Sequence, residues 1–265
     1  MSAEQGTVAA VSCNDEYTFT KPNRDEIVLV AGLGVSGDVH AGVHVRHRHR
    51  VKLDPGQPNL RQVHLIQAEL FEEVAGKGYA VPPGGLGENV TTRGIDLLGL
   101  PRGTILRFGR TRADGAPADG APADGGLGGG SRGAGASGSA PGAVAGVLAA
   151  ARAATLDEAT ARAAAAVEAA AARDEAAATA RAAAGDEVDG DARAAVVVTG
   201  LRNPCAQING FRAGLLKEMV GHDGEGNVVR KAGVMAVVLR GGVVRPGDPV
   251  SIEFPPGEGE PLELV

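Results

Sequence analysis

A cysteine in a polar turn is the residue of this chain best suited to do chemistry. Cys205 follows an apolar, strand-like run, and three polar residues surround it: Arg202, Asn203 and Gln207. A thiolate is both a nucleophile and a soft metal ligand, and a nearby guanidinium favours the charged form of the thiol. The same segment could hold an anionic cofactor through the charge of Arg202 and the side-chain amides of its neighbours. A buried structural cysteine explains these residue types equally well.

A glycine-rich segment, 32–42, carries a second pair of candidate groups. Asp38 could orient His40 or accept a proton from it, which would give an acid–base couple. The glycine spacing imitates a dinucleotide-binding fingerprint, but that motif needs a helix at its third glycine, and the valines that follow favour a strand. We therefore reject dinucleotide binding. A structural turn and a loop whose N–H groups approach a phosphate both remain open.

Four of the six histidines lie within residues 40–49, interleaved with arginines. Such a cluster suggests zinc, yet cationic neighbours weaken cation binding and no cysteine lies close in sequence. A basic strip suits an anion better, so the arginines are candidate phosphate partners: Arg46, Arg48 and Arg50. A solvated basic surface without a ligand is the alternative.

Polar side chains also occur in two further strand-like segments. His64 lies in the apolar run 63–66, where a structural role and a site role are both open. Segment 87–94 places many hydrogen-bonding groups between two glycines. Asn89 and Arg93 could bind an anionic cofactor there, although the same residues also suit a turn at a strand edge.

Composition narrows the class of protein. The 265 residues carry a net charge of -6, which argues against a general nucleic-acid binder. No apolar run is long enough to span a membrane, and the N-terminal residues do not resemble a signal peptide. Two cysteines far apart in sequence do not indicate a disulfide framework, so we expect a reduced, cytoplasmic thiol protein.

Short apolar runs separated by Gly and Pro turns predict a mainly β fold, a closed or nearly closed barrel. The predicted strands are 26–30, 63–66, 104–108, 196–198, 234–239 and 249–254, with short helices at 68–75 and 213–220. Residues 240–243 indicate a hairpin turn.

Residues 111–193 differ from the rest of the chain and are interpreted as a low-complexity insertion. Their first part is rich in Ala, Gly, Asp and Pro and predicts a disordered coil. The alanine-rich stretch 147–184 predicts a helix, but large apolar side chains are almost absent from it. We expect that helix to be marginal, solvated and without a chemical role.

Several of these segments together resemble the MOSC family, named for the C-terminal domain of molybdenum cofactor sulfurases. The Arg-Asn-Pro-Cys run ending at Cys205 is similar to the family's cysteine motif. Segment 32–42 resembles its Gly-x-x-Gly-Asp-x-His-x-Gly motif, and 86–89 its Leu-Gly-Glu-Asn motif. Segments 231–236 and 244–248 are similar to its closing strands. The resemblance implies one MOSC-type β-barrel over 8–254, with a core of 8–110 and 194–254.

The resemblance also implies a function. It suggests a molybdenum cofactor (molybdopterin) with Cys205 as metal ligand and Arg202, Asn203, Gln207, Asn89, Arg93, His64 and Arg48 as cofactor-binding residues. Asp38 and His40 would move protons. The bacterial subgroup that the chain resembles is linked to the reduction of N-hydroxylated compounds. In that subgroup a cysteine and a lysine lie near the N-terminus, as Cys13 and Lys21 do here.

Two alternatives to a reductase stay open. Cys205 could carry a persulfide as a sulfur or cofactor carrier, or it could be structural in a binding barrel. Pyridoxal phosphate is also associated with the family, but no lysine is clearly placed for a Schiff base. The chain has too few cysteines for an iron–sulfur cluster and no flavin motif, so a reductase would need a separate electron-donor protein.

Overall fold

The computed structural model describes residues 5–47, 51–52, 54–110, 142, 144–183, 191 and 193–265. Its strands, in chain order, are β1 (Gln5–Ser12), β2 (Asn23–Arg24), β3 (Ile27–Val30), β4 (Gly34–Val35), β5 (Val63–Gln67), β6 (Val90–Arg93), β7 (Ile105–Phe108), β8 (Ala194–Leu201), β9 (Val220–His222), β10 (Val228–Arg230), β11 (Val234–Arg240), β12 (Gly242–Val244) and β13 (Pro249–Glu253). Its labelled helices are α2 (Ala68–Ala75), α3 (Ala145–Ala153), α4 (Glu158–Ala183), α5 (Gln207–Phe211) and α6 (Leu215–Glu218).

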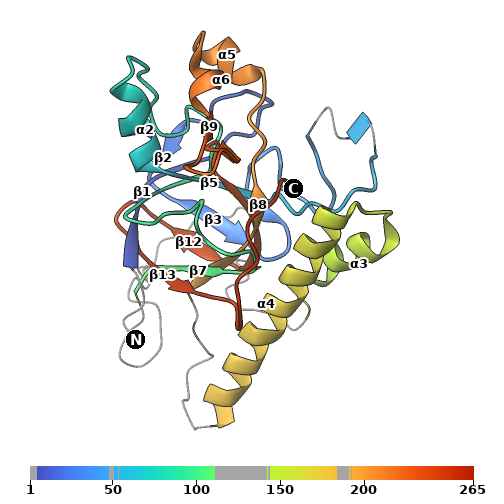
Figure 1. Ribbon diagram of the computed structural model, residues 1–265. Helices are drawn as coiled ribbons and strands as arrows, with labels where there is room; N and C mark the ends of the chain where they lie inside the picture. The colour runs from blue at the N-terminus through green and yellow to red at the C-terminus, as the bar shows by residue number, and fades with distance from the viewer. Residues whose placement is uncertain are drawn as a thin grey trace, which may run out of the picture.

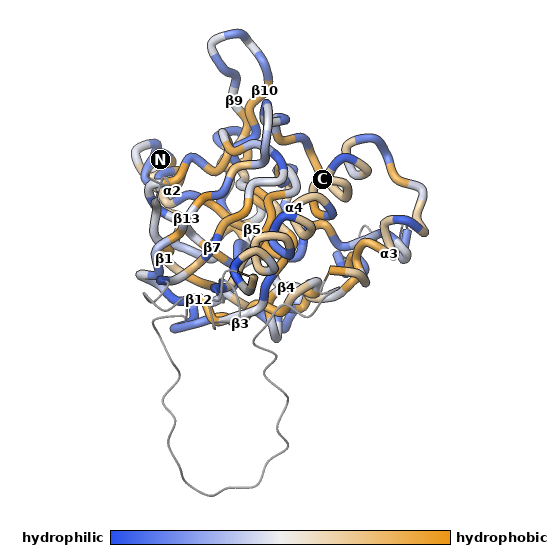
Figure 2. The backbone as a smooth tube through the Cα atoms, turned by 90° about the horizontal axis from the view of Figure 1, so that it is seen from below, coloured by the Kyte–Doolittle hydropathy of each residue, from blue (hydrophilic) through white to orange (hydrophobic). Residues whose placement is uncertain are grey.

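Seven strands of the described residues close a barrel in the order β13-β7-β8-β11-β5-β6-β1, because β1 also pairs with β13. The pairing is antiparallel except between β5 and β6, so the barrel is mixed. A three-stranded sheet, β12-β3-β4, lies beside it (Figure 1). The β9–β10 hairpin projects from the body of the molecule (Figure 2).

The continuous apolar runs form strands that are buried on both faces. Val196 and Val198 of β8 point into the barrel core, whereas Val197 belongs to an outer apolar cluster. β11 alternates in the same way, with Val237 in the outer cluster. A strand covered on one face alone would alternate apolar and polar residues, so these runs require a cover outside the barrel.

Helices α3 and α4 of the insertion provide that cover. In Figure 1, α4 runs along one side of the barrel with α3 beside it. Residues Ala163, Val167 and Ala170 follow the i, i+4, i+7 spacing of one helix face and pack into the outer cluster with Val147 of α3. The expectation of a solvated helix with little to bury was therefore wrong. Because its side chains are small, α4 lies close to β8. The close approach gives many van der Waals contacts, which compensate for the absence of large apolar side chains on the helix.

The other predicted elements meet mixed outcomes. The strands at 26–30, 63–66, 104–108, 196–198, 234–239 and 249–254 and the helix at 68–75 are confirmed, with shifts of a few residues at their ends. Strands β7 and β8 are neighbours, as expected for an insertion between two consecutive strands. The hairpin at 240–243 was wrong, since β12 pairs with β3 rather than with β11. Near 213–220 the helix shortens to α6, and α5 was not predicted.

Two predictions remain, one on the start of the insertion and one on membrane-spanning segments. The disordered coil at the start of the insertion lies outside the described residues, apart from Gly142. Among the described residues, no helix combines the length and apolar character needed to cross a membrane.

Candidate functional site

Cys205 lies in the loop between β8 and α5. Strand β8 ends at Leu201, and the Arg202 N–H then donates to the Gly233 carbonyl at 2.9 Å, which ties the loop to the start of β11. The half-buried Cys205 is a free thiol whose Sγ lies 3.6 Å from Gln207 Oε1. A strand end thus fixes the backbone of the loop, while the thiol stays accessible.

Arg202 places a buried cation next to this thiol. Its guanidinium carbon lies 5.9 Å from the centre of the Phe19 ring. Its Nη1 is buried and has no hydrogen-bond partner among the described residues. Burial lowers the pKa of Arg202, and the nearby Cys205 and Glu88 oppose that shift. A buried guanidinium nitrogen without a partner is costly, and an anionic ligand would remove that cost.

Asp38 organises a second group of polar side chains behind the cavity. One carboxylate oxygen receives Lys21 Nζ at 2.5 Å and Asn89 Nδ2 at 2.8 Å, and the other lies 3.2 Å from His40 Nδ1. Although burial alone would raise the pKa of Asp38, hydrogen bonds from His40 and the charge of Lys21 hold it well below its usual range. Asp38 is therefore a fixed carboxylate that orients His40 and is poorly suited to accept a proton.

His64 occupies β5 between this group and the cysteine loop. Its Nε2 lies 2.8 Å from the Ala232 carbonyl, and its backbone N–H donates to Asn89 Oδ1. Burial, followed by the charge of Arg202, lowers the pKa of His64 well below its ordinary value. The imidazole is therefore neutral, and its ring is fixed by a backbone carbonyl. Gly233 makes this packing possible, because a Cβ there would lie 2.2 Å from the Leu65 carbonyl oxygen.

Glu88 fixes the segment that carries Asn89. Its carboxylate accepts the Gly84 and Leu86 N–H groups and the Thr91 hydroxyl. Burial raises the pKa of Glu88, which these hydrogen bonds oppose. Sequence inspection noted Glu88 only as part of a motif; the structure gives it the role of shaping the loop from within.

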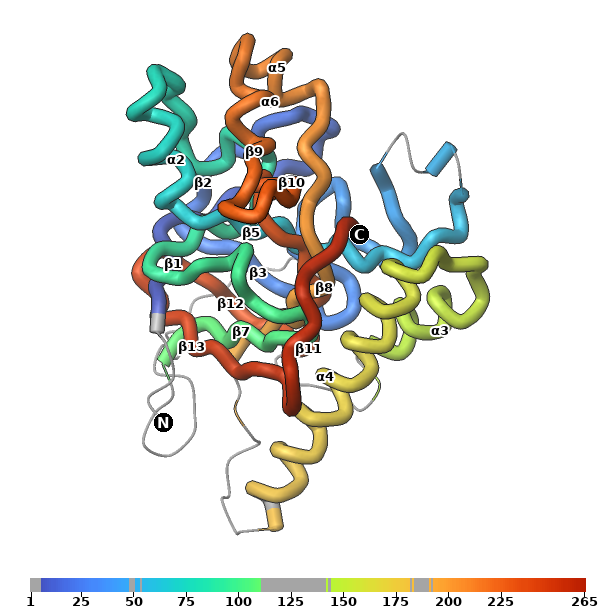
Figure 3. The backbone as a smooth tube through the Cα atoms, in the orientation of Figure 1, coloured from blue at the N-terminus to red at the C-terminus, as the bar shows by residue number. Residues whose placement is uncertain are grey.

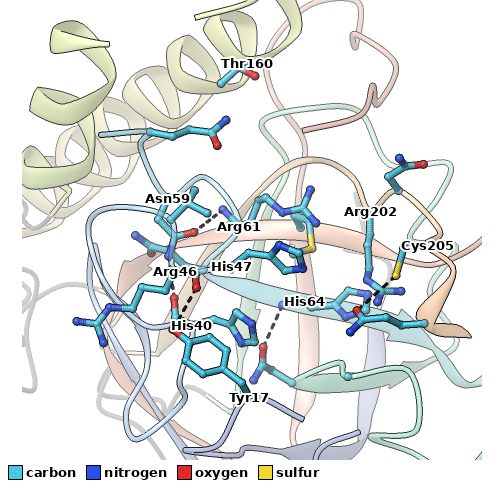
Figure 4. Close-up of a pocket in the computed structure, with 18 of the residues that line it drawn as sticks. Tyr17, His40, Arg46, His47, Asn59, Arg61, His64, Thr160, Arg202 and Cys205 are labelled. Atoms are coloured by element: carbon cyan, nitrogen blue, oxygen red, sulfur yellow. Dashed lines mark hydrogen bonds between the residues drawn. The ribbon is translucent and has the colours of Figure 1, made fainter. Parts of the chain in front are cut away.

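These groups meet at a cavity of about 870 Å³. Figure 4 shows the rings of His40 and His64 and the side chain of Arg202 turned toward it, with Cys205 at one side. Seven residues predicted for the site line this cavity: Cys205, Arg202, Asn203, Gln207, His40, His64 and Asn89. Asn89 uses its amide on Ser12, Asp38 and His64, so it holds the wall together rather than offering a free donor.

Two predicted cofactor-binding residues are not in this group. Arg93 lies on the surface, where it pairs with Glu72 at 2.8 Å, so its assignment to the cofactor was wrong. The reason is distance along the chain, because Asn89 precedes β6 and Arg93 is its last residue. Arg48, with His49 and Arg50, lies outside the described residues.

The histidine cluster and the N-terminal pair Cys13 and Lys21 were the other candidates for chemistry. The described residues contain no group of three His, Cys, Asp or Glu side chains arranged for a metal ion. Burial, and then the charge of Asp38, raises the pKa of Cys13, which keeps that thiol protonated. Lys21 lines the cavity but is held by Asp38.

Several lining residues were not predicted. Tyr17 and Phe19 supply aromatic rings, and Tyr17 packs edge-on against His40 with ring centres 5.8 Å apart. Arg61 also lines the cavity and donates to the Val265 carbonyl; the C-terminal segment that holds this carbonyl runs beside β8 (Figure 3). The α3–α4 turn of the insertion contributes Thr155, Leu156 and Asp157, and the first turn of α4 contributes Thr160. One sequence signal could have revealed this wall. The strands β8 and β11 carry apolar residues on their outer faces as well, and such faces must be covered by another element.

Comparison with solved structures identifies the fold. The YuaD protein from Bacillus subtilis matches over 95% of this chain and 97% of its own, with a TM-score of 0.53 at 16% identity. This chain has the fold of YuaD. The predicted fold class, a mainly β MOSC-type barrel with short helices and an inserted segment, is confirmed.

Other comparisons add little beyond the fold. YiiM from Escherichia coli matches over 96% of this chain and 73% of its own, with a TM-score of 0.44 at 14% identity. No family model and no curated protein matches the chain. The function must therefore be argued from the site.

Proposed function

We propose that this chain is a molybdenum-cofactor-binding member of the MOSC family that reduces N-hydroxylated compounds, with Cys205 as the protein ligand of molybdenum. The observation that carries the proposal is an accessible thiol in one cavity with a buried guanidinium nitrogen of Arg202 that has no hydrogen-bond partner among the described residues. A thiolate is a metal ligand, and a phosphate-bearing cofactor needs a cation.

The residues present fit such a group. The cavity volume of about 870 Å³ lies within the usual range for cofactor and ligand sites. Arg202 would bind an anionic part of the cofactor, Gln207 would orient the Cys205 thiol, and Asn203 would add an amide at the rim. When bound, the cofactor supplies the electron pair that the N–O bond takes up.

The chain's own residues would handle the protons. Reduction of an N-hydroxyl group takes two electrons and two protons, breaks the N–O bond, and releases water and the N–H product. Asp38 stays ionised and holds His40 through Nδ1. When Nδ1 donates to Asp38, Nε2 is the ring atom left for the substrate, and there it would take up a proton from water and pass it to the departing oxygen.

Electrons must come from another protein under this proposal. The chain has two cysteines, whereas an iron–sulfur cluster held by thiolates takes four. We therefore propose a separate electron-donor protein as a partner and an N-hydroxylated small molecule as substrate.

The test compares the two cysteines in a host that makes molybdenum cofactor. We expect near-stoichiometric molybdenum and pterin in the wild type, and loss of both in Cys205→Ala, by elemental mass spectrometry and pterin fluorescence. Cys13→Ala is the matched control and should keep both, because Cys13 lies outside the cavity lining.

Absence of molybdenum from all three proteins would overturn the proposal. The accessibility of the Cys205 thiol would then favour the second candidate, a persulfide carrier. Intact-mass measurement with and without a reductant would show a reducible addition of one sulfur atom on Cys205.

A further inference from the structure

The insertion contributes a wall to the candidate site. Thr155, Leu156 and Asp157, from the turn between α3 and α4, and Thr160, in the first turn of α4, line the same cavity as Cys205. Figure 4 shows Thr160 entering from the helical side, across the cavity from Cys205 and His64, which belong to the barrel side. The shape of the cavity therefore depends on a segment that lies far from the motif residues in sequence.

The α3–α4 turn is held in one conformation. Asp157 accepts the Thr160 N–H at 2.8 Å and the Thr160 hydroxyl at 3.1 Å, which caps the start of α4. Thr160 is only 5% exposed. A capped helix start fixes the direction of the side chains around it, so the wall has a defined shape.

Helix α4 is in turn fixed to the barrel. Asp174 bonds to Arg107 of β7 at 2.8 Å and to Arg240 of β11 at 3.1 Å, and all three side chains are buried. Val167 packs fully buried in the outer apolar cluster. These contacts keep the α3–α4 turn at a set position relative to the cavity.

The turn also gives the cavity an apolar surface. Leu156 packs against the outer cluster that includes Met235, and both side chains line the cavity. The groups suited to chemistry, Cys205, Arg202 and His40, are polar. The cavity thus offers polar groups for a reacting centre and an apolar surface for an attached substituent.

We propose that the α3–α4 turn determines substrate size and shape at this site. Leu156 and Met235 would contact a compact apolar or aromatic substituent, while Thr155 at the rim would limit how far that substituent extends. The substrate class rests on the proposed reductase function; the control of access to Cys205 does not.

Access is tested by alkylation of Cys205 in full-length protein from a host that makes no molybdenum cofactor. Iodoacetamide and a pyrene maleimide serve as small and bulky probes, with peptide mass spectrometry to separate Cys205 from Cys13. Thr155→Trp enlarges an exposed lining residue without disturbing the packed core. We expect it to slow the bulky probe about tenfold relative to the small one.

Two further variants sharpen the result. Leu156→Ala should speed the bulky probe relative to the small one. Ala176→Trp places the same bulk on an exposed part of α4 away from the cavity and should match the wild type. Equal rate ratios in Thr155→Trp, Leu156→Ala and the wild type would overturn the proposal.

Kinetics separate this inference from the proposed function. With cofactor-loaded protein and an electron donor, Thr155→Trp should lower kcat/KM for a bulky aromatic N-hydroxylated substrate about tenfold more than for hydroxylamine. Changed alkylation ratios without any reduction would sink the reductase and leave the access role standing. If the protein reduces the substrates but Thr155→Trp changes neither the alkylation ratio nor the ratio of kcat/KM values, the access role is overturned and the reductase stands.

Discussion

The two walls of the cavity are held in place in different ways. Strands of the barrel pair through backbone hydrogen bonds, and Asp38 adds a buried polar group behind the histidines. Among the described residues, no strand of the barrel pairs with α3, α4 or the turn between them. Packing of small side chains and the Asp174 ion pairs fix it instead. The barrel wall therefore fixes the candidate site groups, such as His40 and His64, while the insertion wall can vary without moving them.

A buried carboxylate anchors each wall. Asp38 serves Lys21, His40 and Asn89 within the barrel side, whereas Asp174 joins one helix to two strands. Loss of the Asp38 carboxylate should destabilise the whole fold, whereas loss of the Asp174 carboxylate should mainly detach the insertion helices from the barrel.

The largest effect is expected from Asp38→Asn. This change leaves buried Lys21 without its counter-charge, which costs about 3–5 kcal/mol of unfolding free energy. Urea unfolding at pH 7 measures the loss. Glu72→Gln removes an exposed ion pair with Arg93 and should leave the unfolding curve unchanged.

At acid pH, the difference in unfolding free energy between Asp38→Asn and the wild type should become smaller. Because the folded state lowers the pKa of Asp38, the stabilisation is complete above the unfolded pKa of about 4 and declines as pH falls through the lower folded value. A difference that grew below pH of about 4 would contradict this electrostatic account.

A smaller and more local effect is expected from Asp174→Asn. Arg240 loses its buried counter-charge, but Arg107 retains Glu253 and Asp191, so we expect a loss of about 2–3 kcal/mol. Hydrogen exchange should accelerate in α4 more than in β5. Glu168→Gln, which breaks an exposed pair with Arg152, is the control and should change neither. Equal acceleration in helix and barrel would show that the two walls unfold as one unit.

The smallest effect is expected from Val167→Ala. The change removes two buried methyl groups between α4 and β8, which costs about 1.5 kcal/mol at roughly 0.8 kcal/mol for each group. Thermal unfolding measures this loss. An unchanged transition would mean that α4 contributes little by packing and is held by its charges alone.

The elements that sequence inspection predicted well share one property: a strong local signal. Apolar runs such as 196–198 and 234–239 became strands because a short β-branched run bounded by turns has few other uses. The motif containing Cys205 and Arg202 lies in a loop after a strand end, and both side chains line the cavity. The strand 104–108 and its partner 196–198 paired as expected.

The elements that it predicted poorly depend on distant partners. Residues 240–243 have the composition of a hairpin, yet β12 pairs with β3, and nothing local distinguishes the two outcomes. Arg93 lies near Asn89 in sequence, but Glu72 of α2 holds it at the surface. One helix was expected over 147–184, and the structure divides it into α3 and α4. The burial of α4 depends on Val197 and Val237 of two distant strands, which no local pattern reveals.

The sequence by itself determined the strand-rich character of this protein and named several of the polar side chains that line the cavity. Residue type and local periodicity are properties of neighbouring residues, so they can be read in one dimension. Only the tertiary structure decided that Asp38 orients His40 and that the insertion lines the cavity. It also decided that Nη1 of Arg202 is buried without a hydrogen-bond partner among the residues that the structure describes. Each of these depends on burial and on contacts between residues far apart in the chain, which exist only once the barrel has closed.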